Sequence, residues 1–523
     1  MTVSSSEVVA LRGITKRFGS LVATRAANLS VAQSEVHALV GENGAGKSTL
    51  MNILYGVHQP TEGTIVIEGK EVQVSNPARA IALGVGMVHQ HFKLVPSFTV
   101  AQNIILGAEP GQGMMLREGD ANEQVAELSR RFDLELDPRV AVRDLPVGLQ
   151  QRVEILKTLY RNANILILDE PTAVLTPQET RELFATMRRL AASGKSIIFI
   201  THKLKEVIAV SDRISVMRQG EIVQTLPNLG VTPETLATAM VGRSVILQVV
   251  KMPATPKGVA LKVQNLDVQG DRGIKAVTGA SFEVCRGEIV GIAGVQGNGQ
   301  DELVAAIVGA RKPLSGKIAI NGRDVADADP LSVRKFGLAY VPADRARVGL
   351  CLQSPIWENL TLGHQNSASL GFGPLLSLNR ALNRAATLIT GFDVRGAQPG
   401  TLAGALSGGN QQKIVLAREL DSQANLIVVD QPSQGVDIGA IESIHRTLVT
   451  MRDAGRGVLL VSADLDEIFS LSDRIVVMYR GEIVGQLETK DTNVEEVGRL
   501  MGGILPATPN LTHPENVGAA HGH

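Results

Sequence analysis

Short runs of consecutive apolar residues recur along the chain, and amphipathic stretches of helical period separate them. Three such runs in the first part of the chain are Val36–Val40, Ile165–Leu168 and Ile197–Ile200. Uninterrupted apolar runs of this length are typical of parallel strands that are buried on both faces, and the stretches between them predict the covering helices. The pattern therefore predicts an α/β fold.

The same pattern is written twice. Glu35–Gly56 aligns with Glu288–Gly309 without a gap, and Ser193–Val223 matches Ala454–Val484. A repeat of this length indicates two similar domains in tandem. We expect the first domain over residues 1–242, an exposed linker over 243–258 where Pro and Lys gather, and the second domain over 259–503. The Pro-, Asn- and Gly-rich end, 504–523, is expected to be a disordered tail.

Composition excludes several classes of protein. The 523 residues carry a net charge of −1, which argues against a surface that coats nucleic acid. The two cysteines, Cys285 and Cys351, are too few for a disulfide framework and suit a reducing compartment. No apolar run approaches the roughly 20 residues of a membrane helix, and the first residues lack the pattern of a signal peptide. We expect a protein of the cytosol or of the cytosolic face of a membrane.

The stretch "GENGAGKS", Gly41–Ser48, stands between a predicted strand and a predicted helix. Its spacing is that of a P-loop, whose backbone N–H groups and helix N-terminus face the phosphates of a nucleotide. Lys47 is expected to reach the β- and γ-phosphates, and the Ser48 hydroxyl to ligate Mg²⁺. The alternative is a glycine-rich turn without a ligand. The expected ATP-binding residues are Gly41, Glu42, Asn43, Gly44, Ala45, Gly46, Lys47, Ser48 and Thr49.

Two carboxylates follow the second apolar run. Asp169 is expected to hold the Mg²⁺ shell, and Glu170 to orient the water that attacks the nucleotide. The second copy reads Asp430 and Gln431 at the same place. An amide has the shape of a carboxylate but cannot accept a proton, so the second copy is expected to lack this function.

Four further segments resemble the motifs of ABC-type ATPases. Leu406–Leu420, "LSGGNQQKIVLAREL", resembles their signature, and Leu145–Tyr160 is its counterpart in the first half. His89–Gly107 is similar to their Q-loop, and Ile200–Lys203 to their switch-histidine segment. Together these segments make the chain resemble the fused double ATPase of simple-sugar importers, and "HQHF" and "EPTAVLTPQE" resemble its ribonucleoside-importing branch. The resemblance implies two tandem ABC-type domains, each a mixed sheet core with a helical signature subdomain.

The resemblance assigns roles to three further residues. Gln90 is implied to act in catalysis and at Mg²⁺, His202 to sense the γ-phosphate, and Phe18 to stack on adenine. The residues by themselves leave alternatives open. His202 and Phe18 are also compatible with core packing, and His89 and His91 are spaced like a pair of metal ligands.

The second copy loses each of these groups. Gln300, Asp301, Ala343, Gln431 and Ala463 stand for Lys47, Ser48, Gln90, Glu170 and His202, and Phe18 falls near Val268. Gly294, Gly297 and Gly299 remain. The degenerate site is expected to comprise Gly294, Gly299, Gln300, Asp301, Asp430 and Gln431, with weak or metal-dependent nucleotide binding and no useful hydrolysis.

The signature segments show the reverse pattern. The second half keeps Ser407, Gly408, Gly409 and Asn410, whereas the first half has Pro146, Val147 and Leu149. In ABC dimers each nucleotide lies between the P-loop of one domain and the signature of the other. The resemblance therefore implies one composite site with Glu170, the intact signature and Asp437, and a second with Gln431 and Thr176.

The resulting hypothesis is the ATP- and Mg²⁺-dependent ATPase of an ABC importer for a simple sugar or a nucleoside. It implies two membrane permease subunits, an extracellular solute-binding protein and no nucleic acid, with the fused pair acting alone or as two copies. The rival class is a soluble double ATPase that acts on ribosomes or DNA, which is expected to keep both catalytic glutamates. A nucleotide-binding regulator without turnover is the third possibility, and Lys47, Glu170 and His202 argue against it.

An importer also needs an apolar groove that grips its permease. Phe92, Leu94 and Phe98 are the expected groove residues, with Leu350, Leu352 and Trp357 as their counterparts in the second half. Packing inside the helical subdomain is the alternative, and we expect it for Val100 and Ile104.

Overall fold

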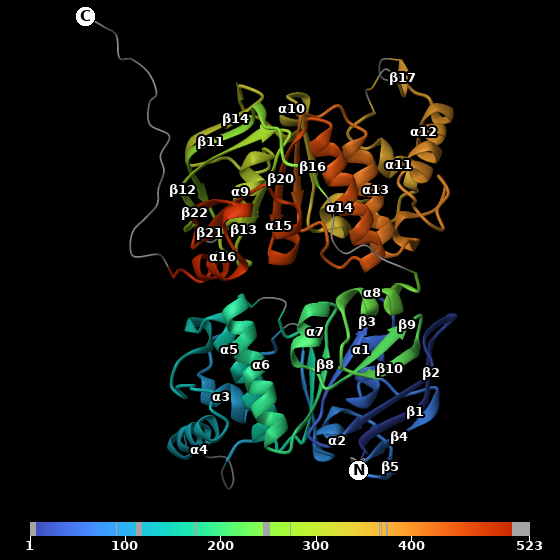
Figure 1. Ribbon diagram of the computed structural model, residues 1–523, viewed down its shortest axis with the longest axis vertical. Coiled ribbons are helices and arrows are strands. Elements are labelled where there is room, and N and C mark those ends of the chain that lie inside the picture. Colours follow the sequence, from blue (N-terminus) through green and yellow to red (C-terminus); the bar gives the residue numbers. More distant parts are fainter. Residues whose placement is uncertain are drawn as a thin grey trace, which may run out of the picture. The chain divides into compact units, whose positions relative to one another are not determined.

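A computed structural model describes residues 7–89, 92–110, 118–172, 175–243, 251–271, 273–365, 367, 369–372 and 375–504. The chain divides into two compact units (Figure 1). The first comprises Met1–Gln248 with Gly435–Ser443, and the second comprises Val249–Gln434 with Ile444–His523. The expected tail lies outside the described residues apart from Ile504, and so do residues 244–250 of the expected linker. Strand β11 begins at Lys257, inside the segment that we expect to be linker.

The first unit contains two sheets and a group of helices. Its strands are β1 (Glu7–Phe18), β2 (Leu21–Ala32), β3 (Val36–Gly41), β4 (Glu62–Ile67), β5 (Lys70–Val72), β6 (Val85–Val88), β7 (Ile165–Asp169), β8 (Ser196–Ile200), β9 (Arg213–Arg218) and β10 (Glu221–Pro227). Its helices are α1 (Lys47–Leu54), α2 (Pro77–Ala82), α3 (Val100–Ile105), α4 (Glu118–Arg131), α5 (Val147–Tyr160), α6 (Pro177–Ala192), α7 (Leu204–Val210) and α8 (Pro233–Val241), with the short 3-10 turn η1 (Val142–Asp144).

The strands of the first unit form a six-stranded sheet in the order β10-β9-β3-β8-β7-β6 and an antiparallel sheet in the order β2-β1-β4-β5. The inner strands of the larger sheet run parallel, and β10 is antiparallel to β9. Helices α3, α4 and α5 pack on one another and form a subdomain, which Figure 1 shows away from the antiparallel sheet. This is the predicted mixed sheet core with a helical signature subdomain.

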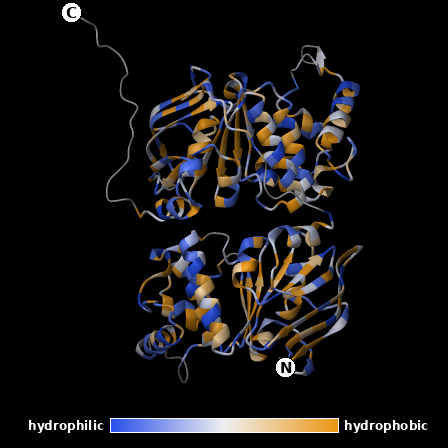
Figure 2. Ribbon diagram, viewed as in Figure 1, coloured by the Kyte–Doolittle hydropathy of each residue, from blue (hydrophilic) through white to orange (hydrophobic). Residues whose placement is uncertain are grey.

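The larger sheet is covered on both faces, as its uninterrupted apolar strands predict. In β8, Ile197 and Phe199 belong to one hydrophobic cluster, and Ile198 and Ile200 belong to another on the opposite face. This alternation follows from the two-residue period of a strand. The central strands are accordingly hydrophobic along their whole length (Figure 2).

The second unit repeats this design. Its strands are β11 (Lys257–Gln269), β12 (Lys275–Arg286), β13 (Ile289–Ala293), β14 (Ser315–Ile320), β15 (Arg323–Asp324), β16 (Leu338–Val341), β17 (Gly371–Phe372), β18 (Leu375–Leu376), β19 (Leu426–Asp430), β20 (Gly457–Ser462), β21 (Arg474–Tyr479) and β22 (Glu482–Glu488). Its helices are α9 (Gln300–Ile307), α10 (Pro330–Lys335), α11 (Ile356–Thr361), α12 (Leu378–Gly391), α13 (Gly408–Leu420), α14 (Ile438–Asp453, whose start lies in the segment grouped with the first unit), α15 (Leu465–Leu471) and α16 (Val494–Met501). The short turns η2 (Arg345–Gly349), η3 (Ala403–Ala405) and η4 (Thr489–Asp491) complete the unit.

The sheets of the second unit have the orders β16-β19-β20-β13-β21-β22 and β12-β11-β14-β15, and β17 pairs with β18. These orders match those of the first unit strand for strand, apart from the additional hairpin. The repeat in the sequence is therefore a repeat of the fold, and the paired strands of the two halves identify structural counterparts.

Candidate functional site: a P-loop and the strand that ends in two carboxylates

The glycine-rich loop bends between β3 and α1, where the backbone passes close to neighbouring strands. Gly44 and Gly46 have φ angles of 80° and 103°, which side chains of L-residues rarely adopt. A Cβ on Gly46 would lie 2.4 Å from the carbonyl oxygen of Ala23, and one on Gly41 would lie 2.3 Å from that of Met217. Only glycine fits both places, so the glycines of the loop are required by its geometry.

Lys47, the first residue of α1, is buried with 6% of its surface exposed. Its Nζ donates hydrogen bonds to the carbonyl oxygens of Gly41 at 2.7 Å and Glu42 at 2.9 Å. Burial lowers the pKa of Lys47, while the carboxylates of Glu170, Asp169 and Glu42 oppose the shift. The ammonium group thus lies among the carbonyls of its own loop and faces the acidic end of β7. Among the other expected loop residues, Asn43, Gly44 and Ser48 are exposed, Glu42, Gly46 and Thr49 are half-buried, and Ala45 is buried.

Glu170 follows the last residue of β7 in a left-handed conformation, with φ 47°. Its N–H donates to the carbonyl oxygen of Ile200 on β8 at 2.9 Å, which fixes the strained turn. Its Oε1 lies 3.0 Å from Nδ1 of His202, the residue that follows β8 by two positions. The structure therefore brings two of the three expected catalytic residues into direct contact.

The pKa values of the two adjacent carboxyl groups, Asp169 and Glu170, are shifted in opposite directions. Burial, together with the neighbouring charge of Glu170, raises the pKa of Asp169 to about 6, although Lys47 opposes this. Burial alone would also raise the pKa of Glu170, but the hydrogen bond and charge of His202 lower it below its usual value. Glu170 is consequently a carboxylate at neutral pH, held by an imidazole.

The residues present fit a magnesium ion. The Asp169 carboxylate and the exposed Ser48 hydroxyl are hard oxygen donors, the kind that Mg²⁺ prefers. A nearby cation would also favour the ionised form of Asp169, whose proton is otherwise held by burial. Gln90 and His91 lie outside the described residues. Over the part of the chain that is described, no group of three or more His, Cys, Asp or Glu side chains is arranged to hold a metal ion.

Phe18 ends β1 with 42% of its surface exposed. Its ring meets that of His58 edge to face at 5.2 Å, and Lys16 Nζ lies 5.1 Å from the ring centre. With this exposure the ring of Phe18 is not part of the packed core, which was the alternative to stacking on a base.

Strand register identifies the counterpart of Phe18. Thr15 pairs with Glu62 just after an irregularity in β1, and Asp267 pairs with Ser315 just after the same irregularity in β11. Counting on from these pairs makes Gly270, two residues after Val268, the equivalent of Phe18. Val268 is fully buried in the core.

The second half keeps the bend of the loop without its charge. Gly297 and Gly299 have φ angles of 90° and 100°, and a Cβ on Gly299 would lie 2.3 Å from the carbonyl oxygen of Ala276. Gln300 is buried like Lys47, and its Nε2 donates to the carbonyl oxygen of Val295 at 3.1 Å. An amide takes the place of the ammonium group.

Gln431 adopts the same left-handed conformation as Glu170, with φ 45°. Its N–H donates a hydrogen bond to the carbonyl oxygen of Val461 at 2.8 Å, and its Oε1 accepts a hydrogen bond from the N–H of Ala463 at 3.2 Å. The side chain is thus engaged by the backbone of the residue that replaces the histidine. Burial and the nearby Asp301 raise the pKa of Asp430 to about 7. Oδ1 of Asp430 has no hydrogen-bond partner among the described residues.

The two signature helices begin differently. Ser407 is the exposed N-cap of α13, and its Oγ accepts a hydrogen bond from Nδ2 of Asn410 at 3.0 Å. Pro146 is the N-cap of α5, which forms from Val147 onward. Proline is tolerated at a helix start because no intrahelical N–H is lost there. The fold therefore survives the change, as expected, while the hydroxyl of the signature is missing from the first half.

A recess of about 380 Å³ lies between the sheet and the helical subdomain of the first unit. Its lining includes Ile81, Met87, Lys93, Glu154, Lys157, Thr158 and Arg161. The amino-acid sequence does not predict this recess, because its residues come from four separate segments; the only local signal is the pair of cations Lys157 and Arg161. We refer to it below as the recess.

The expected groove residues do not line the recess. Leu94 packs partly against the core, and Phe98 is 37% exposed. Leu350, expected at the matching surface of the second half, is buried with 6% exposure, so the expectation was wrong for this residue, whereas Leu352 and Trp357 are half-buried. Val100 and Ile104 are fully buried, which confirms the packing role expected for them.

Comparison with known proteins now decides the family. The profile described as "ABC transporter" matches residues 24–173 and 277–434, once in each unit. The chain belongs to the ABC transporter family. It is 47% identical over 501 residues to the nucleoside import ATP-binding protein NupA of Lactococcus lactis subsp. cremoris (strain MG1363), covering 96% of this chain and 99% of that protein. It is 46% identical over 496 residues to the guanosine import ATP-binding protein NupO of Bacillus subtilis (strain 168), covering 95% and 97%.

As a member of this family, the chain is a tandem ABC ATPase coupled to transport. Among solved structures, an archaeal ribosome recycling factor, aABCE1, in complex with the ribosomal stalk protein aP1, aligns with a TM-score of 0.60. The alignment covers 94% of this chain and 92% of the recycling factor at 20% identity, so it shows the shared fold alone. Within the described ranges, no helix is both long enough and apolar enough to cross a membrane.

Proposed function

We propose that the chain is the ATP-hydrolysing subunit of an importer whose solute is a nucleoside, with a simple sugar as the alternative. Two relatives that match nearly its whole length are import ATP-binding proteins for nucleosides and for guanosine. The observation that carries the catalytic part is the contact of Glu170 Oε1 with His202 Nδ1 at 3.0 Å, in the half that also contains Lys47.

In the proposed reaction Glu170 orients the attacking water, and His202 holds its carboxylate and senses the γ-phosphate. Lys47 and the backbone N–H groups of the loop neutralise the phosphates. Ser48 and Asp169 hold Mg²⁺, which supplies further charge neutralisation when it is bound. Gln90 and Phe18 complete the proposed site, at the metal shell and the base respectively.

We assign no useful hydrolysis to the second P-loop. Gln300 brings no charge to the phosphates, and the Gln431 amide cannot take up a proton. The exposed Asp301 adds a negative charge at the helix start. Nucleotide binding at this loop therefore requires a metal ion or is weak.

We further propose that the two halves pair head to tail, as the family resemblance implies. The intact signature, Ser407 to Asn410, then serves the loop with Lys47 and Glu170, and the Pro146 signature serves the loop with Gln431. This pairing is supported by the distribution of the substitutions: it collects every defect in one composite site. Independent loss would have scattered them over both.

The proposal implies two membrane permease subunits and an external solute-binding protein, with the chain on the cytoplasmic face of the membrane. The test is uptake into proteoliposomes that contain the chain, the permeases and the solute-binding protein. We expect ATP-dependent uptake of labelled guanosine or another ribonucleoside, which unlabelled nucleoside abolishes. Competition by ribose instead would favour the sugar branch.

A second measurement separates the proposal from its rival. The chain is mixed with membranes that contain the permeases and with ribosomes, and its sedimentation with each is compared. Sedimentation with ribosomes, in the absence of any ATP-dependent uptake, would replace the importer by a soluble double ATPase.

A further inference from the structure

The recess of the first unit has walls of different origin. Ile81 comes from α2, Met87 from β6, and Lys157 and Thr158 from α5. Met87 is buried and Thr158 turns its Oγ1 to the carbonyl oxygen of Ile155 at 2.7 Å. The floor of the recess is therefore apolar, and its polar groups lie toward its edges.

Positive charge exceeds negative charge around this opening. Lys93, Lys157 and Arg161 line it together with a single carboxylate, Glu154. Glu154 is buried and already accepts a hydrogen bond from the N–H of Lys93 at 2.6 Å. Burial lowers the pKa of Lys157, and the attraction of the Glu154 carboxylate opposes this shift. The positive charges of Arg161 and Lys93 lower the pKa further. An additional anion at the opening would relieve the repulsion among the three cations.

The same place in the second unit can be identified from helix caps. Asn76 caps α2 and Asp329 caps α10, so Arg334 is the counterpart of Ile81. Pro146 precedes α5 as Ser407 precedes α13, and counting from these caps makes Arg418 and Glu419 the counterparts of Lys157 and Thr158.

A shared hydrogen-bond pattern supports this equivalence. Lys157 Nζ donates to the carbonyl oxygen of Lys93 at 3.3 Å, and Arg418 Nη1 donates to that of Gly349 at 2.8 Å. Nearby, Oδ1 of Asn359 accepts from the N–H of Cys351 at 2.8 Å, which repeats a bond that Asn103 makes in the first unit.

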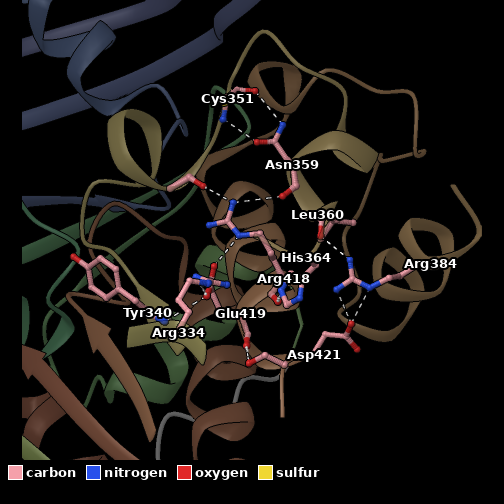
Figure 3. A network of polar contacts seen from close by, with 12 residues as sticks. Arg334, Tyr340, Cys351, Asn359, Leu360, His364, Arg384, Arg418, Glu419 and Asp421 are labelled. Carbon is pink, nitrogen blue, oxygen red and sulfur yellow. Dashed lines mark hydrogen bonds and ion pairs between the residues drawn. The ribbon is translucent and has the colours of Figure 1, made fainter. Parts of the chain in front are cut away.

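A buried ionic network joins the two walls at this place in the second unit (Figure 3). Arg334 Nη1 donates to Oε2 of Glu419 at 2.8 Å, and Arg418 Nε donates to Oε1 at 2.8 Å. Glu419 has no exposed surface. The Arg334–Glu419 pair spans from α10 to α13, the helices that correspond to the opposite walls of the recess. Tyr340 stands where the first unit has Met87, and its N–H also approaches Glu419.

We propose that the two halves engage their permease subunits unequally. The recess of the first half takes a carboxylate-bearing side chain from a cytoplasmic loop of one permease, and the Arg334–Glu419 pair closes the same place in the second half. The inference rests on the proposed function, since it requires a permease partner. Charge complementarity selects the occupant: the surplus of lysine and arginine at an apolar recess suits an acidic side chain on a short protein segment.

The closure of the second half is physically robust. A side chain that entered there would have to separate Glu419 from its two arginines and leave a carboxylate buried without a partner, which is strongly unfavourable. The second permease contact is therefore confined to the surface of that half, whereas the first half offers an insertion site.

The test transplants the network from one half into the other. The double variant Ile81→Arg/Thr158→Glu introduces the Arg334–Glu419 pair into the recess, and the matched variant Arg334→Ile/Glu419→Thr removes it from the second half. Affinity for the permease pair in nanodiscs is measured for the full chain, with thermal unfolding as the check of folding. We expect Ile81→Arg/Thr158→Glu to bind the permeases at least about tenfold more weakly than the unmodified chain. The affinity of Arg334→Ile/Glu419→Thr should stay within about twofold of the unmodified chain. A single Lys157→Gln substitution should weaken binding and reduce its dependence on salt.

A carbodiimide, which joins a carboxylate directly to a contacting amine, identifies the occupant in the assembled transporter. We expect Lys93 or Lys157 to be joined to an acidic residue of a permease. Equal sensitivity of the two halves, or unchanged affinity of the recess variant, would overturn the inference. A third outcome would also overturn it: Lys93 and Lys157 form no crosslink to a permease carboxylate, and inorganic phosphate protects them from acetylation. The occupant of the recess would then be a free anion. Failure of the unmodified chain to bind the permeases would instead refute the proposed function.

Discussion

Replacement of Glu170 by glutamine tests the central assignment with the smallest possible change of shape. The second half shows that the fold accepts it, since Gln431 adopts φ 45° where Glu170 has φ 47°. The amide oxygen can still accept a hydrogen bond from His202 Nδ1, which lies 3.0 Å from Glu170 Oε1. Folding should therefore be preserved while the charge is lost.

The expected effect on rate is large. A positioned general base contributes about 10²–10⁴-fold, which corresponds to about 2.7–5.4 kcal/mol in activation free energy. No second carboxylate takes over, because the counterpart in the other half is an amide. The pKa of Asp169 should fall as well, since the charge of Glu170 adds to the effect of burial in raising it. Occupancy by Mg²⁺ should therefore not decrease.

The assay is steady-state phosphate release by the full transporter in nanodiscs. Glu170→Gln should retain at most about 1% of the activity, by the lower bound for a general base. The control is Gln431→Glu, which should stay within a few-fold of the unmodified protein because Gln300 and Asp301 still occupy that loop. Substantial activity in Glu170→Gln, or a large gain in Gln431→Glu, would refute the assignment of a single hydrolytic site.

Three further predictions concern the signature, the loop and the carboxyl pair. Ser407→Ala should reduce phosphate release by about tenfold or more through loss of a γ-phosphate donor, while Pro146→Ser should change little; equal sensitivity would contradict the head-to-tail pairing. Gly46→Ala should lower the thermal unfolding midpoint, because its φ of 103° and the carbonyl 2.4 Å from the new Cβ impose strain of roughly 1–3 kcal/mol or more; an unchanged midpoint would show that the loop relaxes. The pKa of Asp169 is raised from 3.8 to about 6, so the native state holds this proton more tightly and the group's contribution to stability decreases as pH rises through that window. Asp169→Asn should remove this component from the pH profile of unfolding without nucleotide, and an unaltered profile would contradict the pKa shift.

Much of the fold was predictable because its signals are local. The apolar runs that predict strands at Val36–Val40 and Ile197–Ile200 coincide with β3 and β8 to within a residue at each end. Runs without polar interruption leave a strand no face for solvent, so the double covering of the sheet follows. The loop from Gly41 to Ser48 was equally readable, because the spacing of its glycines, Lys47 and Ser48 lies within eight consecutive residues.

The amino-acid sequence by itself determined that the chain contains one ATPase fold twice, and that Lys47, Glu170 and His202 occur only in the first copy. Tertiary structure decided how these groups meet. The 3.0 Å contact of His202 with Glu170 joins the ends of two strands, and the bond from Ala463 to Gln431 has no signature in either segment.

Tertiary structure alone also decided the recess and its closure. Ile81 and Thr158 lie on helices that are distant in sequence, as do Arg334 and Glu419, and no local pattern reveals that they face one another. Burial of Leu350 likewise depends on which helices cover it. The pattern of a strand or of a glycine-rich loop can be read from consecutive residues, whereas a cavity or a buried ion pair exists only where packing brings separate segments together.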